Sequence, residues 1–238
     1  MLLDSVKAMD IDKLLELEER IGTGFKNHDL LLQALTHRSY INENPKWHLD
    51  QNERLEFLGD AVLELAVTEY LYNNYPDPEG ELTNWRAALV NSIMLAKIST
   101  KFDLNNYLLL SRGEAKDVGR ARQYILANAV EAVIGAIYLD QGYQTANDFI
   151  SRFVLEELSE ILKGGAYKDY KSRFQEEAQD RVGITPTYEV LKEWGPDHAK
   201  HFNIGVFLEK ELAGEGEGPS KQDAQQEAAK DALEKKEW

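Results

Sequence analysis

The 238-residue sequence has no cysteine, only six prolines, and far fewer basic than acidic side chains. Without cysteine, disulfide bonds and cysteine-ligated zinc sites are excluded, and the chain is compatible with a reducing compartment. No apolar run approaches the roughly 18 residues of a membrane span, and the N-terminal segment lacks the basic and apolar regions of a secretory signal. We therefore expect a cytoplasmic protein that makes no membrane contact.

Acidic residues outnumber basic ones by 42 to 27, which gives a formal net charge of −15. Affinity for a nucleic acid comes largely from lysine and arginine, so this charge argues against tight binding of a polyanion. Local basic patches and bound cations can still hold one, because binding depends on the local field. Any such binding is therefore expected to be weak and sensitive to salt and divalent ions.

The most informative segment is residues 52–69, NERLEFLGDAVLELAVTE, whose apolar spacing predicts a helix. Within an arc of about 80° this helix carries four carboxylates: Glu53, Glu56, Asp60 and Glu64. The residues expected on its opposite, core-facing side are Leu55, Leu58, Val62, Leu65 and Ala66. Like charges one turn apart repel each other. The stripe therefore indicates either a solvated acidic face or a site for a hard cation such as Mg²⁺.

Two residues favour the cation site over the solvated face. Phe57 projects near the acidic stripe, where a large apolar side chain needs a covering surface. Gly59 lies in mid-helix, where glycine costs about 1 kcal/mol relative to alanine. Its presence there indicates the close approach of another backbone or helix.

Residues 125–140, ILANAVEAVIGAIYLD, predict a second and mostly apolar helix with an interior glycine, Gly135. Asn128 and Glu131 are the polar residues in its centre, and they share a face because they lie three positions apart. Burying them without partners is unfavourable. We therefore expect the two helices to pair face to face. The oxygen cluster expected from this pairing consists of Glu56, Asp60, Asn128 and Glu131.

Both segments closely resemble ribonuclease III. ERLEFLGDAVL at 53–63 is similar to the signature helix of that family, and ILANAVEAVIGAIYLD is similar to its second acidic helix. The resemblance runs the length of the chain and includes a C-terminal double-stranded-RNA-binding domain. It implies a metal-dependent, homodimeric endonuclease of double-stranded RNA that leaves 5′-phosphates and short 3′ overhangs, with precursor ribosomal and messenger RNAs as typical substrates.

The expected fold is an all-α endonuclease domain over residues 1–163, a glycine-rich linker at 164–167, and an α-β-β-β-α RNA-binding domain over 168–238. Further helices of the first domain are expected at 11–21, 28–37, 81–100 and 146–162, with Leu89, Ile93, Leu95 and Ala96 as core candidates. In the second domain the expected helices are 169–182 and 220–236, and the expected strands are 187–194, 202–208 and 210–213. GEGEGP at 214–219 is expected to form a turn.

Phosphodiester hydrolysis requires an activated water and charge compensation on the leaving oxygen, both of which divalent metals supply. Without cysteine, and with none of the five histidines near an obvious serine nucleophile, a covalent mechanism is not indicated. We expect Glu56, Asn128 and Glu131 to ligate Mg²⁺, or alternatively Mn²⁺. Asp60, together with Glu131, is the expected catalytic residue and would position or activate the water. No small-molecule cofactor is expected.

Supporting roles in the first domain are also expected. Glu53 is peripheral and is expected to support the site or the dimer. Phe57 beside Gly59 fits a dimer seam. The resemblance matches Glu79 and Glu114 to acidic positions linked to RNA processing and dimer contacts.

In the C-terminal domain the resemblance assigns RNA contacts. Gln175 and Gln179 match residues that reach minor-groove 2′-hydroxyls, and His198 lies in the loop that enters the next minor groove. Ser220 and Lys221 stand at the start of the last helix, where helix N-termini favour phosphate.

The sequence departs from the family pattern at two places. Asn128 stands where the family commonly has aspartate, so the enzyme either works with a neutral ligand or is attenuated or silent. Lys221 is followed by Gln222 and Asp223 where the family usually has a run of lysines, and residues 168–238 contain 11 basic against 16 acidic side chains. One alternative is therefore a non-catalytic RNA-binding protein of the same fold. A helical-bundle metalloprotein is another, but it typically needs Glu-x-x-His pairs, which these helices lack.

Overall fold

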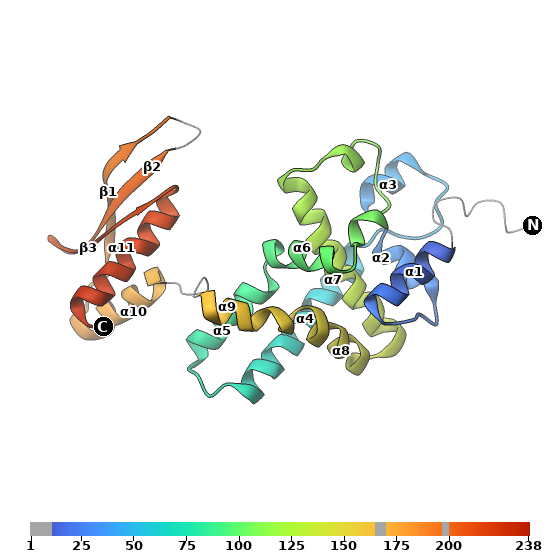
Figure 1. Ribbon diagram of the computed structural model, residues 1–238, viewed down its shortest axis with the longest axis horizontal. Coiled ribbons are helices and arrows are strands. Elements are labelled where there is room, and N and C mark those ends of the chain that lie inside the picture. The colour runs from blue at the N-terminus through green and yellow to red at the C-terminus, as the bar shows by residue number, and fades with distance from the viewer. Residues whose placement is uncertain (1–10, 165–169, 197–199) are drawn as a thin grey trace, which may run out of the picture. The chain divides into compact units, whose positions relative to one another are not determined.

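The computed structural model describes residues 11–164, 170–196 and 200–238. The chain separates into two units, Met1–Tyr167 and Lys168–Trp238. In its described residues the first unit is helical apart from an isolated bridge between Thr36 and Leu109 (Figure 1). None of the described helices is both long enough and apolar enough to span a membrane.

The first unit contains nine α-helices and three short 3₁₀ helices within its described part. The α-helices are α1 (Ile11–Ile21), α2 (His28–Ala34), α3 (Arg38–Glu43), α4 (Glu53–Asn74), α5 (Glu79–Val90), α6 (Ser92–Lys101), α7 (Arg120–Gln141), α8 (Tyr143–Phe153) and α9 (Leu158–Gly164). The 3₁₀ helices are η1 (Leu104–Asn106), η2 (Glu114–Lys116) and η3 (Leu155–Glu157).

The two longest helices, α4 and α7, pack against each other at the centre of the first unit (Figure 1). Their backbones are close because each contributes a glycine to the contact. A Cβ atom built on Gly59 would lie 1.7 Å from the carbonyl oxygen of Glu131, and one on Gly135 would lie 2.2 Å from that of Leu55. The close approach expected at Gly59 is confirmed, and α2, α6 and α8 also pack on α7.

Three expected helices are each broken in the structure. The helix expected at 81–100 divides because the Asn91 side chain accepts a hydrogen bond from Met94 N at 2.9 Å and so starts α6. The helix expected at 28–37 ends at Ala34, because Thr36 forms the bridge to Leu109. The segment 146–162 forms the end of α8, then η3, then most of α9.

The predicted burial was wrong for two of the expected core residues. Leu65 is 58% exposed and Ile93 is 69% exposed. Leu55, Val62 and Ala66 of α4 are buried as expected, and Leu63 and Val67 are buried as well. A helical wheel identifies an apolar arc, but the position of the partner helix decides which part of that arc is covered.

The second unit is an antiparallel sheet in the order β1-β2-β3 with both helices on one face (Figure 1). Its elements are α10 (Tyr170–Val182), β1 (Thr187–Trp194), β2 (His201–Leu208), β3 (Glu211–Gly218) and α11 (Lys221–Lys236). The core between sheet and helices includes Phe174, Val206, Leu208 and Ala228.

The turn expected at 214–219 is wrong, because β3 continues through Gly218. Gly214, Gly216 and Gly218 all face α11, and a Cβ atom on Gly216 would lie 2.1 Å from Ala228 N. Glu215 and Glu217 alternate with these glycines and are exposed. The glycines therefore let a helix lie directly on the strand, which a turn-like composition does not reveal.

Candidate active site

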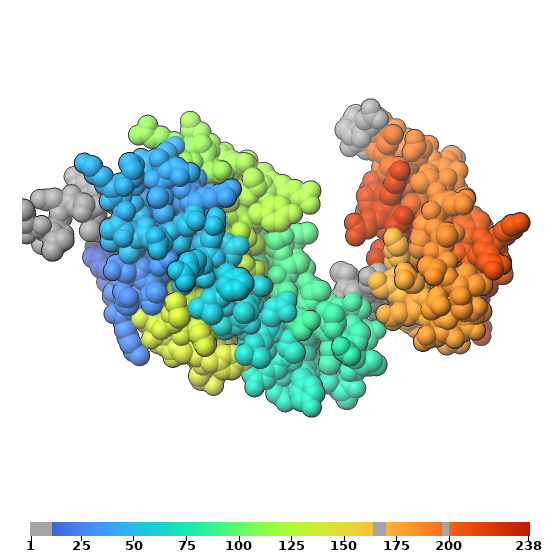
Figure 2. Space-filling view, turned by 180° about the vertical axis from the view of Figure 1, so that it is seen from behind, coloured from blue at the N-terminus to red at the C-terminus, as the bar shows by residue number. Residues whose placement is uncertain are grey.

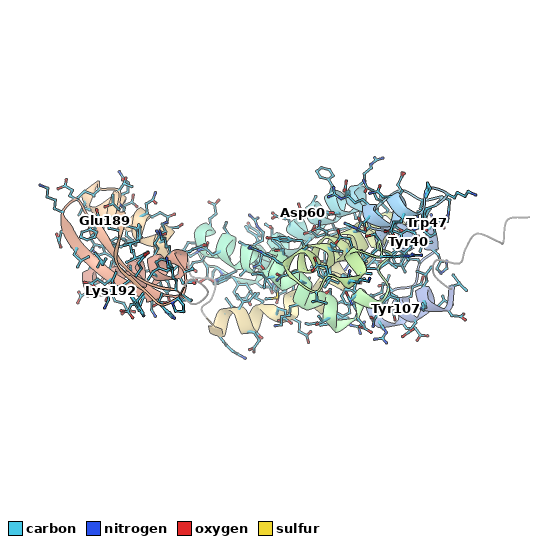
Figure 3. All side chains as sticks on the ribbon, turned by 90° about the horizontal axis from the view of Figure 1, so that it is seen from above. Tyr40, Trp47, Asp60, Tyr107, Glu189 and Lys192 are labelled. Atoms are coloured by element: carbon cyan, nitrogen blue, oxygen red, sulfur yellow. The ribbon has the colours of Figure 1, made fainter. Side chains whose placement is uncertain are left out.

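The α4–α7 crossing brings together the four polar residues that the sequence singled out. Glu56 and Asp60 come from α4, and Asn128 and Glu131 from α7. Asn128 hydrogen-bonds the Glu56 carboxylate, and the charges of Asp60 and Glu56 both act on Glu131. Asp60 is exposed (Figure 3), while the other three are half-buried, so the cluster lies at the edge of the core.

Two carboxyl groups of this cluster, those of Glu56 and Glu131, have raised pKa values. Burial first, and then the negative charges of Asp60 and Glu56, together raise the pKa of Glu131 to about 8. The pKa of Glu56 is also raised, first by burial and then by the charge of Glu53, while the hydrogen bond from Asn128 opposes the shift. Each shift has the sign expected for negative charge without a cationic partner.

The ends of the acidic stripe differ from its middle. Glu64 lies 3.6 Å from Arg86 Nε, and Glu53 lies 3.8 Å from Arg38 Nη1 and accepts a hydrogen bond from Gln51. An arginine therefore already lies against each of these two carboxylates. Among the described residues, no ion pair joins a lysine or arginine to the carboxylates of the cluster.

The cluster fits a hard divalent cation by charge and by donor type. It offers three carboxylates and one amide, the ligand atoms that Mg²⁺ and Mn²⁺ prefer. Burial and the nearby charges of Asp60 and Glu56 make ionisation of Glu131 unfavourable, and a bound cation would favour its charged form. Over the described parts of the chain, no three Asp, Glu, His or Cys side chains already stand close enough to hold a metal ion.

Comparison with known proteins decides the family. A family model described as Ribonuclease-III-like matches residues 27–158, and one described as Double-stranded RNA binding motif matches residues 170–236. The chain is 48% identical over 223 residues to a protein named Ribonuclease 3 from Natranaerobius thermophilus, covering 93% of this chain and 96% of that one. This chain belongs to the ribonuclease III family. It is therefore an endoribonuclease.

Further relatives agree with this family assignment. Ribonuclease 3 of Pelotomaculum thermopropionicum is 45% identical over 223 residues, which cover 93% of this chain and 92% of the relative. A solved structure of the nuclease domain of ribonuclease III from Campylobacter jejuni is 42% identical, with a TM-score of 0.54. It covers 59% of this chain and 95% of that domain, which is described as flexible in a region involved in dimer formation.

The residues assigned to dimer or RNA processing by the ribonuclease III pattern lie outside this cluster. Phe57 is 80% exposed, whereas Gly59 faces α7, so the two do not form one seam. Glu79 lies at the start of α5 and lines a cavity of about 670 Å³ between α4 and α5. The charge of Glu114 acts on His37 and Arg122 rather than on the carboxylates of the cluster.

The predicted RNA contacts of the second unit are accessible where the structure describes them. Gln175 and Gln179 are exposed on α10. The Ser220 hydroxyl accepts a hydrogen bond from Asp223 N at 3.1 Å, so it caps α11. Lys221 is exposed beside it, with its ammonium 5.7 Å from the centre of the Phe202 ring. His198 lies outside the described residues.

One residue of the nuclease unit, Asn52, does not stand out in the sequence because it looks like an ordinary helix cap. It precedes α4, and asparagine is a preferred N-cap residue. Its side chain makes no capping bond here, is 3% exposed, and donates to the carbonyl oxygen of Ala34 instead.

Proposed function

We propose that this chain is a metal-dependent endonuclease of double-stranded RNA, with a nuclease domain at 1–163, a linker at 164–167 and an RNA-binding domain at 168–238. The observation that carries this proposal is the convergence of Glu56, Asp60 and Glu131 at the α4–α7 crossing, where no described lysine or arginine forms an ion pair with them. The chain matches family models for both a nuclease domain and an RNA-binding motif, and metal-dependent RNA cleavage requires such a group of carboxylates.

Mg²⁺ is the proposed cofactor, with Mn²⁺ as a substitute. Glu56, Asn128 and Glu131 would hold the ion, which when bound supplies an activated water and compensates charge on the leaving oxygen. Glu131 must lose its proton first, because a carboxylate binds a cation only in its charged form. Asp60 is exposed one helical turn from Glu56, where it can accept a hydrogen bond from the attacking water and orient it.

Asn128 has a role that an aspartate could not fill in the same way. Its amide donates to Glu56 and so holds that carboxylate in place, whereas its carbonyl oxygen remains available as a neutral ligand. The proposed site therefore has one negative charge fewer than the family pattern, and a lower affinity for metal follows. An attenuated or silent enzyme that only binds RNA is the alternative.

A homodimer is proposed from the surface of α4. Three of its large apolar side chains, Phe57, Leu65 and Tyr72, are exposed, and they share an arc of about 80°. Figure 2 shows the α4 and α5 segments reaching the surface on one face of this unit. An isologous contact would cover the same stripe on both copies. Two sites in such a dimer would cut the two strands and leave 5′-phosphates and short 3′ overhangs.

The proposed substrates are structured precursors of ribosomal and messenger RNA in the cytoplasm. The support is the second unit, whose motif recognises A-form RNA by shape rather than by sequence.

The proposal is tested by incubating the full chain with a long RNA duplex over a range of Mg²⁺ and Mn²⁺ concentrations. Asn128→Asp serves as a matched variant, and single-stranded RNA and duplex DNA are the control substrates. We expect cleavage of the RNA duplex alone, with Asn128→Asp reaching half its maximal rate at lower metal concentration. If the wild type retains RNA but makes no cut at any metal concentration, the RNA-binding alternative holds.

A further inference from the structure

We infer that Asn52 is a positioning residue that fixes the start of α4, and with it Glu56, relative to α7. This inference rests on the metal site of the proposed function. Asn52 is 3% exposed and is one of the few buried polar residues of the described chain. Its side chain is also the nearest polar group before the first carboxylates of α4.

Asn52 uses both its side chain and its backbone to join two helices. Its side-chain nitrogen donates to the Ala34 carbonyl at 3.2 Å, and its backbone nitrogen donates to the Thr36 carbonyl at 2.9 Å. Its own carbonyl accepts from Glu56 N at 2.9 Å, the first bond of the α4 ladder. The buried amide thus connects the backbone of Glu56 directly to the end of α2.

Asn52 occupies the N-cap position of α4, but its side chain does not cap the helix. Asn52 has φ −78° and ψ −12°, which is helical rather than extended, and its side chain caps nothing in α4. A cap would contribute about 1 kcal/mol to the helix. Forgoing the cap is consistent with a side chain whose role is to hold α4 against α2. Gln33 adds to this connection by donating to the Gln51 carbonyl at 3.3 Å.

The same junction is also tied to the segment that precedes α7. His37 N donates to the Leu109 carbonyl at 3.1 Å, and Leu109 N donates to the Leu35 carbonyl at 2.9 Å. Helix α2 itself packs directly against α7. The end of α2 is therefore connected to both helices that supply the cluster.

The glycine contact and the Asn52 junction control different degrees of freedom. Gly59 and Gly135 let α4 and α7 approach each other. The Asn52 bonds fix where α4 begins along its axis, and so where Glu56 stands relative to Asn128 and Glu131. Groups that orient metal ligands from behind commonly change metal affinity or activity by about 10- to 100-fold when they are removed.

The experiment compares the full-length wild type with Asn52→Ala and Asn52→Leu. Leucine fills the space of asparagine without a donor, so it tests the hydrogen bond if the alanine variant folds poorly. Ser99→Ala is the matched control, because Ser99 is also buried and donates its hydroxyl to a backbone carbonyl, that of Ala96 at 2.6 Å on α6. Three quantities are measured: Mn²⁺ binding by electron paramagnetic resonance, binding of duplex RNA in Ca²⁺, and single-turnover cleavage.

We expect both Asn52 variants to need about tenfold more Mn²⁺ for half-saturation and to cut more slowly, with RNA binding unchanged. Ser99→Ala is expected to melt at a lower temperature but to bind Mn²⁺ like the wild type. The inference is overturned if the Asn52 variants bind Mn²⁺ like either the wild type or Ser99→Ala. If the wild type binds Mn²⁺ but does not cut RNA, only the proposed nuclease function is rejected. If it neither binds Mn²⁺ nor cuts RNA, the proposed function and the role of Asn52 are both rejected.

Discussion

In both units a helix packs closely against glycine residues, but the acidic side chains beside these contacts differ in their burial. In the nuclease unit, Gly59 and Gly135 bring two backbones together and leave carboxylates half-buried beside the contact. In the second unit, Gly216 and its neighbours receive α11, while Glu215 and Glu217 point to solvent. Partly buried carboxylates have raised pKa values and would be stabilised by a cation, whereas negative charge in solvent only weakens attraction to a polyanion.

The largest effect is expected from Gly59→Ala, which removes the close contact of α4 and α7. The new methyl group would lie 1.7 Å from a backbone oxygen, so the helices must separate rather than a side chain rotate. Overpacking of this kind costs typically about 1–3 kcal/mol and occasionally more, and we expect about 3 kcal/mol here. At roughly 2–4 °C per kcal/mol, the melting temperature of the nuclease unit would fall by about 10 °C.

Gly80→Ala is the control for that substitution. Gly80 lies in the first turn of α5, and no atom lies within 4 Å of the place that a Cβ atom would take there. Alanine at this position should stabilise the helix by about 0.5–1 kcal/mol. An unchanged or higher melting temperature for Gly59→Ala would contradict the backbone contact.

Gly216→Ala tests the glycine contact of the second unit, and it should destabilise that unit alone. Its Cβ atom would lie 2.1 Å from Ala228 N, so α11 must move away from β3. We expect about 2 kcal/mol of destabilisation. Duplex RNA would be bound less tightly, while Mn²⁺ binding at the nuclease site would be unchanged. A loss of Mn²⁺ binding in this variant would show that the two units do not behave independently.

Glu131→Gln, measured without metal, tests whether the negative charge of Glu131 lowers the stability of the fold. Because burial and the nearby negative charges raise the pKa of Glu131 to about 8 from an ordinary value of 4.5, the protonated carboxyl favours folding below pH 4.5, and this contribution is lost as the pH rises to 8. Glutamine carries no such charge. At pH 9 the variant should therefore be more stable than the wild type, by on the order of 2 kcal/mol after allowance for solvent screening.

Metal should reverse that order. Mg²⁺ binding to the folded wild type raises its stability, whereas Glu131→Gln lacks the ligand and should not respond. The metal concentration for half-maximal cleavage should fall as the pH rises from about 6.5 to about 8.5, because the proton on Glu131 competes with the ion. Thermal melts with and without Mg²⁺ check both points, with Glu19→Gln, an exposed site on α1, as control. Equal melting curves for wild type and Glu131→Gln would refute the buried charge.

Features of this protein that local pattern determines could be predicted from the sequence, whereas features set by tertiary contacts could not. The pairing of α4 with α7 could be predicted from two local features. These are the mid-helix Gly59 and the i, i+3 spacing of Asn128 and Glu131. Ile93 and Leu65 were misplaced because periodicity does not show which arc a partner covers. The position of Asn52 is informative only once Ala34, 18 residues earlier, is known to lie beside it.

The run at 214–219 shows why part of β3 could not be predicted from the sequence. Glycines that alternate with glutamates have the composition of a turn, and only the helix α11 packed on them makes them a strand. The α-β-β-β-α order depends on local pattern and was predicted. The third strand was predicted only at 210–213, and its continuation to Gly218 beneath α11 was not.

The smallest effect is expected from Lys221→Ala, which tests whether the acidic second unit still contacts phosphate. Lys221 is exposed at the start of α11, and the acid surplus of this unit leaves few other cations to replace it. Removing one phosphate contact should weaken duplex binding by about threefold to tenfold and lower the slope of log affinity against log salt by about 1. Lys235→Ala is the control, since Lys235 is ion-paired with Asp231 at 2.6 Å on the last turns of the same helix. If both substitutions weaken binding equally at every salt concentration, Lys221 acts only through net charge, and the phosphate contact is rejected.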